Sequence, residues 1–344
     1  MGIQLFTDRV SAKENLTFDE MVQAAKIVFD ENTPKEEIKS FLLALSDKGE
    51  TTEEIAGLAT VMKANALVVP VLEARYLDNC GTGGDGLKTF NISTTSAFVL
   101  AANDVKVAKH GNRKISSNSG SSDVLQALGI HNEFTVLDSA ELIKQEGIAF
   151  LFAPSVHPKL KRIGEIRKEI GKPTIFNMVG PLTNPVDLKT QLVGINRPDL
   201  VEDYAKVLRL LGRERAVVVS GANGMDEASL SSENTFALLE NGDIKPFTLN
   251  IENLGLSPAP ISALVGSTPE DNAIILRDLL KGKQSPYFDA VLLNAGLGFF
   301  AYGTAVTVKE GIDMARESIF SGKALQKLEA VVEFSQSILK ERAM

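Results

Sequence analysis

Short apolar runs that alternate with helical segments constrain the fold of this chain more than any other feature. From about residue 76, four such runs, rich in β-branched and aromatic residues, stand at 105–109, 148–152, 191–195 and 216–220. Nearly continuous apolar runs imply strands that are buried on both faces, as in a parallel sheet covered by helices. We therefore predict an α/β fold with a mostly parallel central sheet flanked by helices. The Asn-Gly pair at 241–242, between two further apolar runs, predicts a hairpin.

The N-terminal region shows a different pattern, with helical spacing and no strand signal. Three Thr-x-x-Glu sequences have the form of a capping box, and each opens an apolar run: Thr17 with Glu20, Thr33 with Glu36, and Thr51 with Glu54. We predict a small all-α domain over residues 1–70, which forms a dimer surface and is joined by a later helical segment. The larger α/β domain should then cover residues 71–344, and its end, after residue 271, is again helical.

Composition excludes several classes of protein and of site. The formal net charge of −8 argues against nucleic acid or an anionic membrane as the main partner. A single cysteine, Cys80, excludes an internal disulfide and a multi-cysteine metal site, which fits a cytoplasmic protein. We see no secretory signal, and the longest apolar stretch, residues 290–306, is broken by Asn294 and by glycines. That stretch predicts a buried core helix rather than a membrane span.

A glycine-rich loop follows the strand that we expect to end at Cys80. Its sequence is Gly-Thr-Gly-Gly-Asp-Gly at 81–86, and Asn-Ile-Ser-Thr-Thr-Ser at 91–96 then opens a helix. Glycines let backbone N–H groups approach a bulky anion, and a helix N-terminus supplies further donors, so a diphosphate would suit this loop. A plain glycine-rich turn is the alternative. The loop has neither the Walker pattern nor the strict dinucleotide-binding spacing.

A basic, serine-rich loop follows the next strand. Residues 81–122 contain five basic and two acidic side chains, a local charge of +3 within an acidic chain. Lys109 and Arg113 can neutralise phosphate oxygens while the serines at 116–122 donate hydrogen bonds to them. Alone, such a run could be a solvated loop. Because ligands collect at the carboxyl ends of parallel strands, the two successive loops together favour an anion site.

An acidic pair follows the strand at 216–220. Asp226 and Glu227 would face the phosphate loops at the same edge of the sheet. Mg²⁺ binds hard oxygen ligands and takes one or two carboxylates, with phosphate and water completing its shell. The pair therefore predicts Mg²⁺ as the cofactor, although an isolated acidic pair more often only favours a helix N-terminus.

Arg167 lies on a segment that is predicted to be helical after Pro158. Its guanidinium could bind the carboxylate of a substrate, or it could form an ordinary surface salt bridge. The chain has three histidines, which leaves little room for a histidine-rich metal site. Cys80 is best interpreted as a small buried residue rather than a nucleophile.

Taken in order, these segments resemble one enzyme family over nearly the whole chain. The runs DNCGTGGDGLKTFNIST, KHGNRKISSNSGSSDVLQALG, HPKLK, TIFNMVGPLTNP and GMDEASL are similar to those of the anthranilate phosphoribosyltransferases. The resemblance implies a small α domain joined to a large α/β domain, the fold of the pyrimidine nucleoside phosphorylases, and a homodimer. It also implies transfer of the phosphoribosyl group of phosphoribosyl pyrophosphate to the amine of anthranilate, in tryptophan biosynthesis.

The resemblance assigns roles to particular residues. Those implied to bind phosphoribosyl pyrophosphate are Gly81, Gly84, Asp85, Thr89, Asn91, Ile92, Ser93, Thr94, Lys109, His110, Gly111, Asn112, Arg113, Lys114, Ile115, Ser116, Ser117 and Ser121. Those implied to contact anthranilate are Gly81, Asn112 and Arg167, and those implied to coordinate Mg²⁺ are Ser93, Asp226 and Glu227. Residues from Lys109 through Ser117, with Ser121, would form a mobile loop that closes over the substrate.

The sequence departs from the family pattern at three positions. Asn118, Gln126 and Ser220 stand where the family more often has Lys, Glu and His. Two other functions remain as alternatives: a pyrimidine nucleoside phosphorylase, and a non-catalytic, nucleic-acid-binding relative of the same fold. The acidic pair and the KHGN sequence disfavour the first, and the acidic charge with its intact motifs disfavours the second.

Overall fold

The computed structural model describes residues 2–72, 74–112, 120–131, 134–231 and 234–343. The chain begins with four helices: α1 (Gln4–Ser11), α2 (Phe18–Val28), α3 (Lys35–Lys48) and α4 (Thr52–Ala64). The strands that follow are β1 (Leu77–Asp78), β2 (Val107–Gly111), β3 (Ile148–Phe152), β4 (Thr190–Gly194), β5 (Arg215–Ser220), β6 (Thr235–Glu240) and β7 (Asp243–Phe247). The remaining α-helices are α5 (Ile92–Ala101), α6 (Ser121–Ala127), α7 (Val136–Glu146), α8 (Ala153–Val156), α9 (Leu160–Ile170), α10 (Phe176–Val179), α11 (Val201–Leu210), α12 (Pro269–Leu280), α13 (Pro286–Tyr302), α14 (Val308–Phe320) and α15 (Lys323–Ala343).

The strands form one mixed sheet in the order β3-β2-β1-β4-β5-β6-β7. The first five strands in this order are parallel, and β6 and β7 add an antiparallel hairpin at one edge. Strand β4 is buried along its whole length, and β5 is buried except at Arg215. The prediction of an α/β fold with a mostly parallel, helix-covered sheet is confirmed. The hairpin turn has the predicted pair, with positive φ at Asn241 (52°) and Gly242 (84°).

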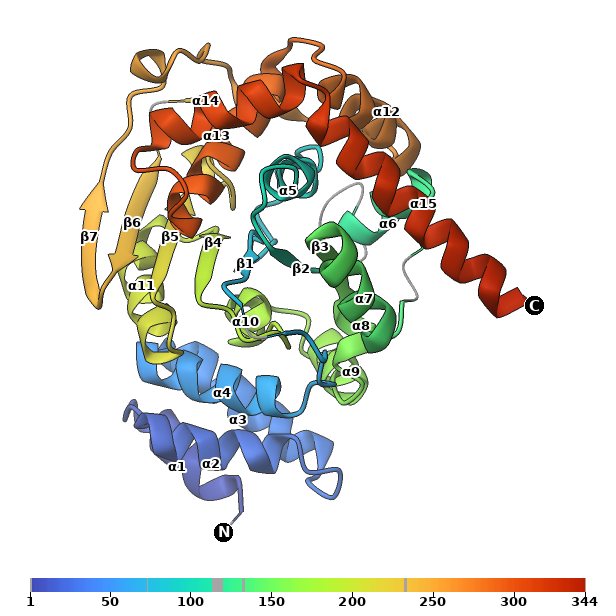
Figure 1. Cartoon of the computed structure of the whole chain (residues 1–344). Coiled ribbons are helices and arrows are strands. Elements are labelled where there is room, and N and C mark those ends of the chain that lie inside the picture. Colours follow the sequence, from blue (N-terminus) through green and yellow to red (C-terminus); the bar gives the residue numbers. More distant parts are fainter. Residues whose placement is uncertain (1, 73, 113–119, 132–133, 232–233, 344) are drawn as a thin grey trace.

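Helices cover the sheet on both faces, and Figure 1 shows α5, α13, α14 and α15 on the side opposite the N-terminal bundle. On that side a hydrophobic cluster joins the sheet to α5 and to the C-terminal helices. On the other side, a second cluster joins Leu58 of α4 and Tyr204 of α11 to Val193 and Val218 of the sheet. Helix α9 also packs on α3. The bundle therefore shares its core with one face of the sheet.

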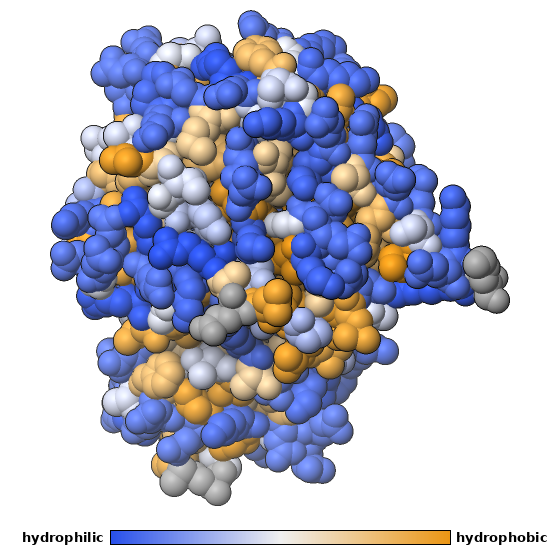
Figure 2. Space-filling model, in the orientation of Figure 1, coloured by the Kyte–Doolittle hydropathy of each residue, from blue (hydrophilic) through white to orange (hydrophobic). Residues whose placement is uncertain are grey.

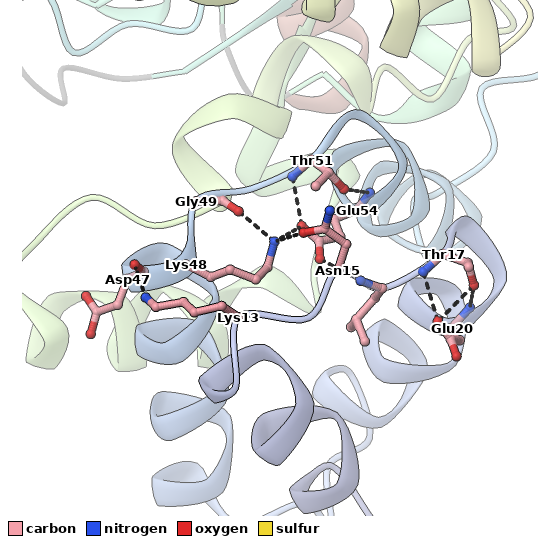
Figure 3. Close-up of polar contacts among 10 residues, drawn as sticks. Lys13, Asn15, Thr17, Glu20, Asp47, Lys48, Gly49, Thr51 and Glu54 are labelled. Atoms are coloured by element: carbon pink, nitrogen blue, oxygen red, sulfur yellow. Dashed lines mark hydrogen bonds and ion pairs between the residues drawn. The ribbon is translucent and has the colours of Figure 1, made fainter.

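A buried ion pair helps to fix the helical bundle. Lys48 and Glu54 form a salt bridge of 3.0 Å, with side chains only 3% and 0% exposed. The Nζ of Lys48 also donates to Asn15 Oδ1 and to the Gly49 carbonyl, as Figure 3 shows. Glu54 accepts from the backbone N–H groups of Leu16 and Thr51, so it also closes the capping box that begins α4. Both charges are thus satisfied within the bundle.

Two of the three predicted capping boxes are present, and one prediction is wrong. Thr17 with Glu20 and Thr51 with Glu54 cap α2 and α4. Helix α3 instead has Pro34 at its N-cap position, without a side-chain cap. The Thr33 hydroxyl donates to the Ile27 carbonyl, 2.7 Å away, which ties the connection to the end of α2. Because the Thr33 hydroxyl is used in this bond, it does not cap the first turn of α3.

Strand boundaries differ from the prediction by small shifts. The strand at 105–109 lies at Val107–Gly111, because its pairing with β3 begins at Val107 opposite Ile148. Strand β1 ends at Asp78 rather than at Cys80, and the chain then makes only an isolated bridge between Gly81 and Gly194.

The apolar stretch at 290–306 is largely within α13, which is buried between the sheet and α14. Its last residues leave the helix, and Val306 is 82% exposed. Within the described residues, none of the helices combines the length and apolar character that crossing a bilayer requires. The face shown in Figure 2 is largely hydrophilic, with smaller hydrophobic areas over the bundle and in the band above it.

Candidate active site at the carboxyl ends of the central strands

Three loops that follow parallel strands meet around one cavity of about 260 Å³. The glycine-rich loop follows β1, the basic loop follows β2, and the acidic loop follows β5. The described residues that line the cavity are Cys80, Gly81, Thr82, Gly83, Asp85, Lys88, Thr89, Phe90, Asn91, Ser93, Thr94, Lys109, His110, Gly111, Asn112, Gly120, Ser121, Ala153, Gly180, Pro181, Asp226 and Glu227. The cavity thus lies where ligands bind in parallel sheets.

Glycines allow the acidic loop to approach the first loop closely. A Cβ at Gly81 would clash with the carboxylate of Asp226, and a Cβ at Gly194 would clash with the Asp226 carbonyl group. The N–H of Gly83 donates to Asp226 Oδ2 at 2.7 Å, and the N–H of Asp226 lies 3.5 Å from Asp85 Oδ2. The backbone of Asp226 therefore lies against both strand ends, and no larger residue fits at Gly81 or Gly194.

Helix α5 directs its N-terminus at the second carboxylate of the acidic loop. Both the N–H and the hydroxyl of Ser93 donate to Glu227 Oε1, at 2.9 and 2.5 Å. Asn91, the N-cap residue, instead accepts a hydrogen bond from Asn272 through its side chain. A negative group at this position is stabilised by the free N–H groups of the first helical turn. Glu227 is thereby held beside the hydroxyl of Ser93.

The two carboxylates are partly buried and repel each other. Burial is the main reason why the pKa of Asp226 is raised well above its usual range, and the charges of Glu227 and Asp85 add to the shift. Burial also raises the pKa of Glu227 to about 7, although the hydrogen bonds from Ser93 oppose the shift. Within the described chain, no Lys or Arg forms a salt bridge with either carboxylate. In that part of the chain, the site therefore brings two carboxyl groups together without a Lys or Arg salt bridge.

The donor set fits a magnesium ion that is also bound by phosphate. Ser93, Asp226 and Glu227 supply hard oxygen atoms at one wall of the cavity, beside a loop that can hold a diphosphate. Over the described residues, no three His, Cys, Asp or Glu side chains are grouped closely enough to hold a metal by themselves. Mg²⁺ characteristically takes one or two carboxylates and completes its shell with phosphate and water. A site of this kind is therefore completed by its substrate.

Lys109 also lines the cavity, and its positive charge opposes the raised pKa of Glu227. It is only 3% exposed, and its Nζ donates to the Asn79 carbonyl at 3.2 Å. The strand that carries it is anchored by the buried Asp78, whose carboxylate accepts from the His110 N–H at 3.2 Å and from Asn184 Nδ2 at 2.9 Å. Burial raises the pKa of Asp78, while the charge of Lys109 opposes that shift. The position of Lys109 is thus set by hydrogen bonds beneath the cavity.

Two neutral histidines lie side by side, and one of them, His110, lines the cavity. The rings of His110 and His157 are 5.2 Å apart, and Nδ1 of His110 lies 3.2 Å from the Gly180 carbonyl. Burial lowers the pKa of His110 to about 3 and that of His157 to about 4, so both rings are uncharged near neutral pH. The Nε2 atoms of both rings are buried and have no partner among the described residues.

Arg167, on α9, does not line the cavity. Its guanidinium donates to Asn177 Oδ1 at 3.1 Å and stands over the ring of Phe176, 5.7 Å from the centroid. Burial lowers the pKa of Arg167, and no carboxylate of the described chain forms a salt bridge with it. The surface salt bridge, one of the two interpretations of this residue, is therefore not observed.

Most residues that the sequence singled out surround the cavity, but not all. Gly84 and Ile92 do not line it, and Ile92 is fully buried in the core. Residues 113–117, which include Arg113, Lys114, Ile115, Ser116 and Ser117, lie outside the described residues, as does Asn118. Sequence reasoning missed Lys88, Gly180, Pro181 and Gly194. A signal existed for Gly180 and Pro181, which belong to the quoted TIFNMVGPLTNP run.

Cys80 is not a nucleophile in this site. Its Sγ donates to Asp78 Oδ2 at 3.3 Å, and burial together with the charge of Asp78 raises the pKa of the thiol well above its usual range. The thiol therefore stays protonated near neutral pH.

Comparison with known proteins gives the same result for sequence and for structure. The models described as "Glycosyl transferase family, a/b domain" and "Glycosyl transferase family, helical bundle domain" match residues 73–325 and 5–66. An anthranilate phosphoribosyltransferase of Listeria monocytogenes is 51% identical over 337 residues, 98% of this chain and 99% of that protein. A Streptococcus mutans protein of the same name is 47% identical over 95% of this chain and 97% of its own length.

Solved structures agree over the same length. The crystal structure of anthranilate phosphoribosyltransferase from Thermus thermophilus has a TM-score of 0.91 and 39% identity, over 96% of this chain and 99% of that chain. The Saccharomyces cerevisiae enzyme in complex with PRPP and Mg has a TM-score of 0.89 and 29% identity, over 97% of this chain and 98% of that chain.

Proposed function

This chain belongs to the anthranilate phosphoribosyltransferase family, and from that premise we propose how its cavity binds the substrates and the metal. The protein is a pentosyltransferase of tryptophan biosynthesis. It transfers the phosphoribosyl group of phosphoribosyl pyrophosphate to the amine of anthranilate, which gives N-(5-phosphoribosyl)anthranilate and pyrophosphate. The meeting of the glycine-rich, basic and acidic loops at one cavity is the observation on which the assignment of roles rests.

Phosphoribosyl pyrophosphate is assigned to the glycine-rich and basic loops. Gly81, Asp85, Thr89, Asn91, Ser93 and Thr94 line one part of its site, and residues 109–112 with Ser121 line another. Residues 113–117 are assigned to the same substrate on the sequence resemblance, and they lie outside the described residues. The lack of Cβ atoms in the first part and the buried charge of Lys109 in the second support this assignment. Ile92 is buried, so any part that it takes would come from its main chain. Gly84 would act through its main chain in the same way.

Mg²⁺ is assigned to Ser93, Asp226 and Glu227. Support comes from two carboxylates that form no salt bridge with a Lys or Arg of the described residues, and from the hydroxyl of Ser93, which lies 2.5 Å from Glu227 Oε1. The solved yeast relative with PRPP and Mg supports the same use of the ion. When bound, Mg²⁺ would neutralise the diphosphate and so favour its departure as pyrophosphate.

Anthranilate is assigned to Gly81, Asn112 and Arg167. The partly buried guanidinium of Arg167 has no carboxylate partner in the described chain, so it is available to an aromatic carboxylate. His110 lines the cavity and His157 lies beside it, and because both rings are neutral they would not repel the amine. A solved yeast relative in complex with 4-fluoroanthranilate shows that the family binds such a ring.

The reaction then requires positioning and charge stabilisation from the protein. Positive charge develops on the ribose as its bond to pyrophosphate breaks, and the amine of anthranilate attacks the anomeric carbon. An aromatic amine carries a free electron pair at neutral pH, so a strong general base is not needed. Lys109 stabilises the negative charge on the leaving group, and the fixed loops hold the two reactants together.

Assembly and location are proposed on more general grounds. We assign residues 1–70 to a small domain that forms the surface of a homodimer, and residues 71–344 to the catalytic domain. The exposed Leu5 of α1, 46% exposed, supports an interface on the bundle. The single cysteine supports a reducing cytoplasm. Light scattering coupled to gel filtration tests the dimer, and a monomer across the micromolar range would contradict it.

Consumption of anthranilate fluorescence tests the function as a whole. Turnover should require phosphoribosyl pyrophosphate together with Mg²⁺, should stop with excess EDTA, and should return when Mg²⁺ is restored. Cleavage of a pyrimidine nucleoside by phosphate, with no consumption of anthranilate, would contradict the proposal and favour a nucleoside phosphorylase.

A further inference from the structure

The buried side-chain amide of Asn294, in α13, contacts the acidic loop. Asn294 is 4% exposed and is the only polar residue of α13 between Ala290 and Ala301. An amide in an apolar helix is unfavourable unless its groups are hydrogen-bonded. The hydrogen bonds of Asn294 connect α13 to the loop that carries the candidate metal site.

The side chain of Asn294 hydrogen-bonds to both main-chain polar groups of one residue of the acidic loop, Ala228. The Ala228 N–H donates to Asn294 Oδ1 at 3.0 Å, and Asn294 Nδ2 donates to the Ala228 carbonyl at 2.9 Å. A third bond joins Nδ2 to the carbonyl of Ala290, one turn earlier in α13, at 2.9 Å. The side chain thus uses both donor hydrogens and its oxygen, and it fixes the loop relative to α13.

Ala228 directly follows the two carboxylates. The loop that carries Asp226 and Glu227 is held on its other side by the close approach of Gly81 and Gly194. The carboxylates repel each other because they share a partly buried site, and this repulsion favours a loop that spreads them apart. The bonds from Asn294 oppose that movement at the adjacent residue.

We propose that Asn294 is a positioning residue which holds the carboxylates of Asp226 and Glu227 in the arrangement that receives Mg²⁺. This inference rests on the proposed metal site: Asn294 lines a small cavity with Ser93, Asp226 and Glu227, and its hydrogen bonds go to Ala228 and Ala290. A merely structural role would predict that replacing Asn294 lowers stability and leaves the magnesium requirement unchanged. A positioning role predicts a weaker response to Mg²⁺ in the protein that is still folded.

The test uses Asn294→Leu, with Leu328→Ala in α15 as a matched control. Leu328 is fully buried in the hydrophobic cluster that also contains the apolar residues of α13. Its truncation therefore lowers stability without a direct change to the acidic loop. For each protein, the melting temperature is measured with saturating phosphoribosyl pyrophosphate over a range of Mg²⁺ concentrations. The midpoint of that titration reports the affinity for the metal without any need for turnover.

The Asn294→Leu midpoint should lie about tenfold above the wild-type midpoint, a shift of about 1.4 kcal/mol in binding. The KM for anthranilate should change less than twofold, and the Leu328→Ala midpoint should equal that of the wild type. An Asn294→Leu midpoint equal to the wild-type value would overturn the inference. If the wild type itself showed no dependence on Mg²⁺, the proposed metal site would fail instead.

A second variant keeps the test decisive if Asn294→Leu does not fold. Asn294→Asp has the same size and retains an acceptor for the Ala228 N–H, but it loses the donor to the Ala228 carbonyl. Its titration should shift in the same direction, whereas a wild-type midpoint would again contradict a positioning role.

Discussion

Carboxylates in the helical bundle and at the strand ends differ in whether they have a cationic partner. In the bundle, Glu54 is fully buried and is paired with Lys48, and its remaining lone pairs accept from main-chain N–H groups. At the strand ends, Asp226 and Glu227 are partly buried, and no described Lys or Arg forms a salt bridge with them. The first arrangement is complete within the chain. On the proposed assignment of Mg²⁺, the second would become complete when the ion binds.

This difference distinguishes a structural charge from a functional one. A paired buried charge fixes the position of an element, and removing one partner leaves the other uncompensated. An unpaired pair of carboxylates costs stability in the free protein, and that cost decreases when a metal binds. The same substitution of a carboxylate by its amide should therefore have opposite consequences in the two regions.

The largest effect is expected for Glu54→Gln. It should lower the free energy of unfolding by about 3–5 kcal/mol, because it leaves the Lys48 ammonium buried without its partner. Urea denaturation measures the loss. Turnover of the protein that remains folded should change less than twofold. A double replacement, Lys48→Met with Glu54→Leu, should recover most of the stability, and a double variant as unstable as the single one would contradict the pairing.

The next effect is expected for Asp226→Asn combined with Glu227→Gln. We expect kcat/KM to fall by about 10²–10³-fold, because the metal loses its protein ligands, while the free energy of unfolding stays equal or rises. Steady-state fluorescence and urea denaturation measure the two quantities. Asp199→Asn with Glu202→Gln, an exposed pair at the start of α11, is the matched control and should change neither. Wild-type turnover in the first variant would show that the metal binds elsewhere.

A smaller effect is expected from pH. In the folded protein without ligands, the pKa of Glu227 is raised to about 7 from an ordinary value of 4.5. Between these values Glu227 binds more protons in the folded state than in the unfolded state, so this residue makes stability fall as pH rises from about 4.5 to 7, and Asp226, whose pKa is also raised, adds to the fall. The loss from Glu227 should be at most about 3 kcal/mol. Urea denaturation between pH 5 and 8 measures it, and Glu227→Gln should flatten the profile; an unchanged slope in that variant would assign the effect to another group.

The smallest effect is expected for Arg167→Ala. The KM for anthranilate should rise about 10- to 100-fold, because a charge-assisted hydrogen bond to its carboxylate is lost, while kcat changes little. Arg162→Ala, on the same helix, removes bonds to the Asp30 and Thr33 carbonyls and should leave that KM unchanged. An unaltered KM in Arg167→Ala would remove this residue from the anthranilate site.

Much of the fold could be predicted because local patterns and burial agreed. The apolar runs of β4 and β5 indicated strands buried on both faces, and the Asn-Gly pair at 241–242 indicated the hairpin. Thr33 misled the prediction because its hydroxyl bonds to the preceding helix, a tertiary contact that no local pattern contains.

The site was predictable where its chemistry lies in consecutive residues. The glycine-rich loop and the acidic pair could be recognised in this way, and the cavity joins them. Gly194 and Asn294 could not, because their importance comes from contacts with Asp226 and Ala228, which are distant in sequence. Asn294 was visible only as an interruption in an apolar stretch, and the sequence did not indicate its partner.

Within the described residues, no Lys or Arg forms a salt bridge with Asp226 or Glu227, and on our proposal a divalent metal of the substrate complex takes that place. Soaking crystals with Mn²⁺ and phosphoribosyl pyrophosphate, and recording anomalous scattering from manganese, tests it directly. We expect a peak at about 2–2.5 Å from a carboxylate oxygen of this pair, beside Ser93 and the glycine-rich loop. A bound diphosphate whose metal peak lies away from both carboxylates would rule out the proposed metal site.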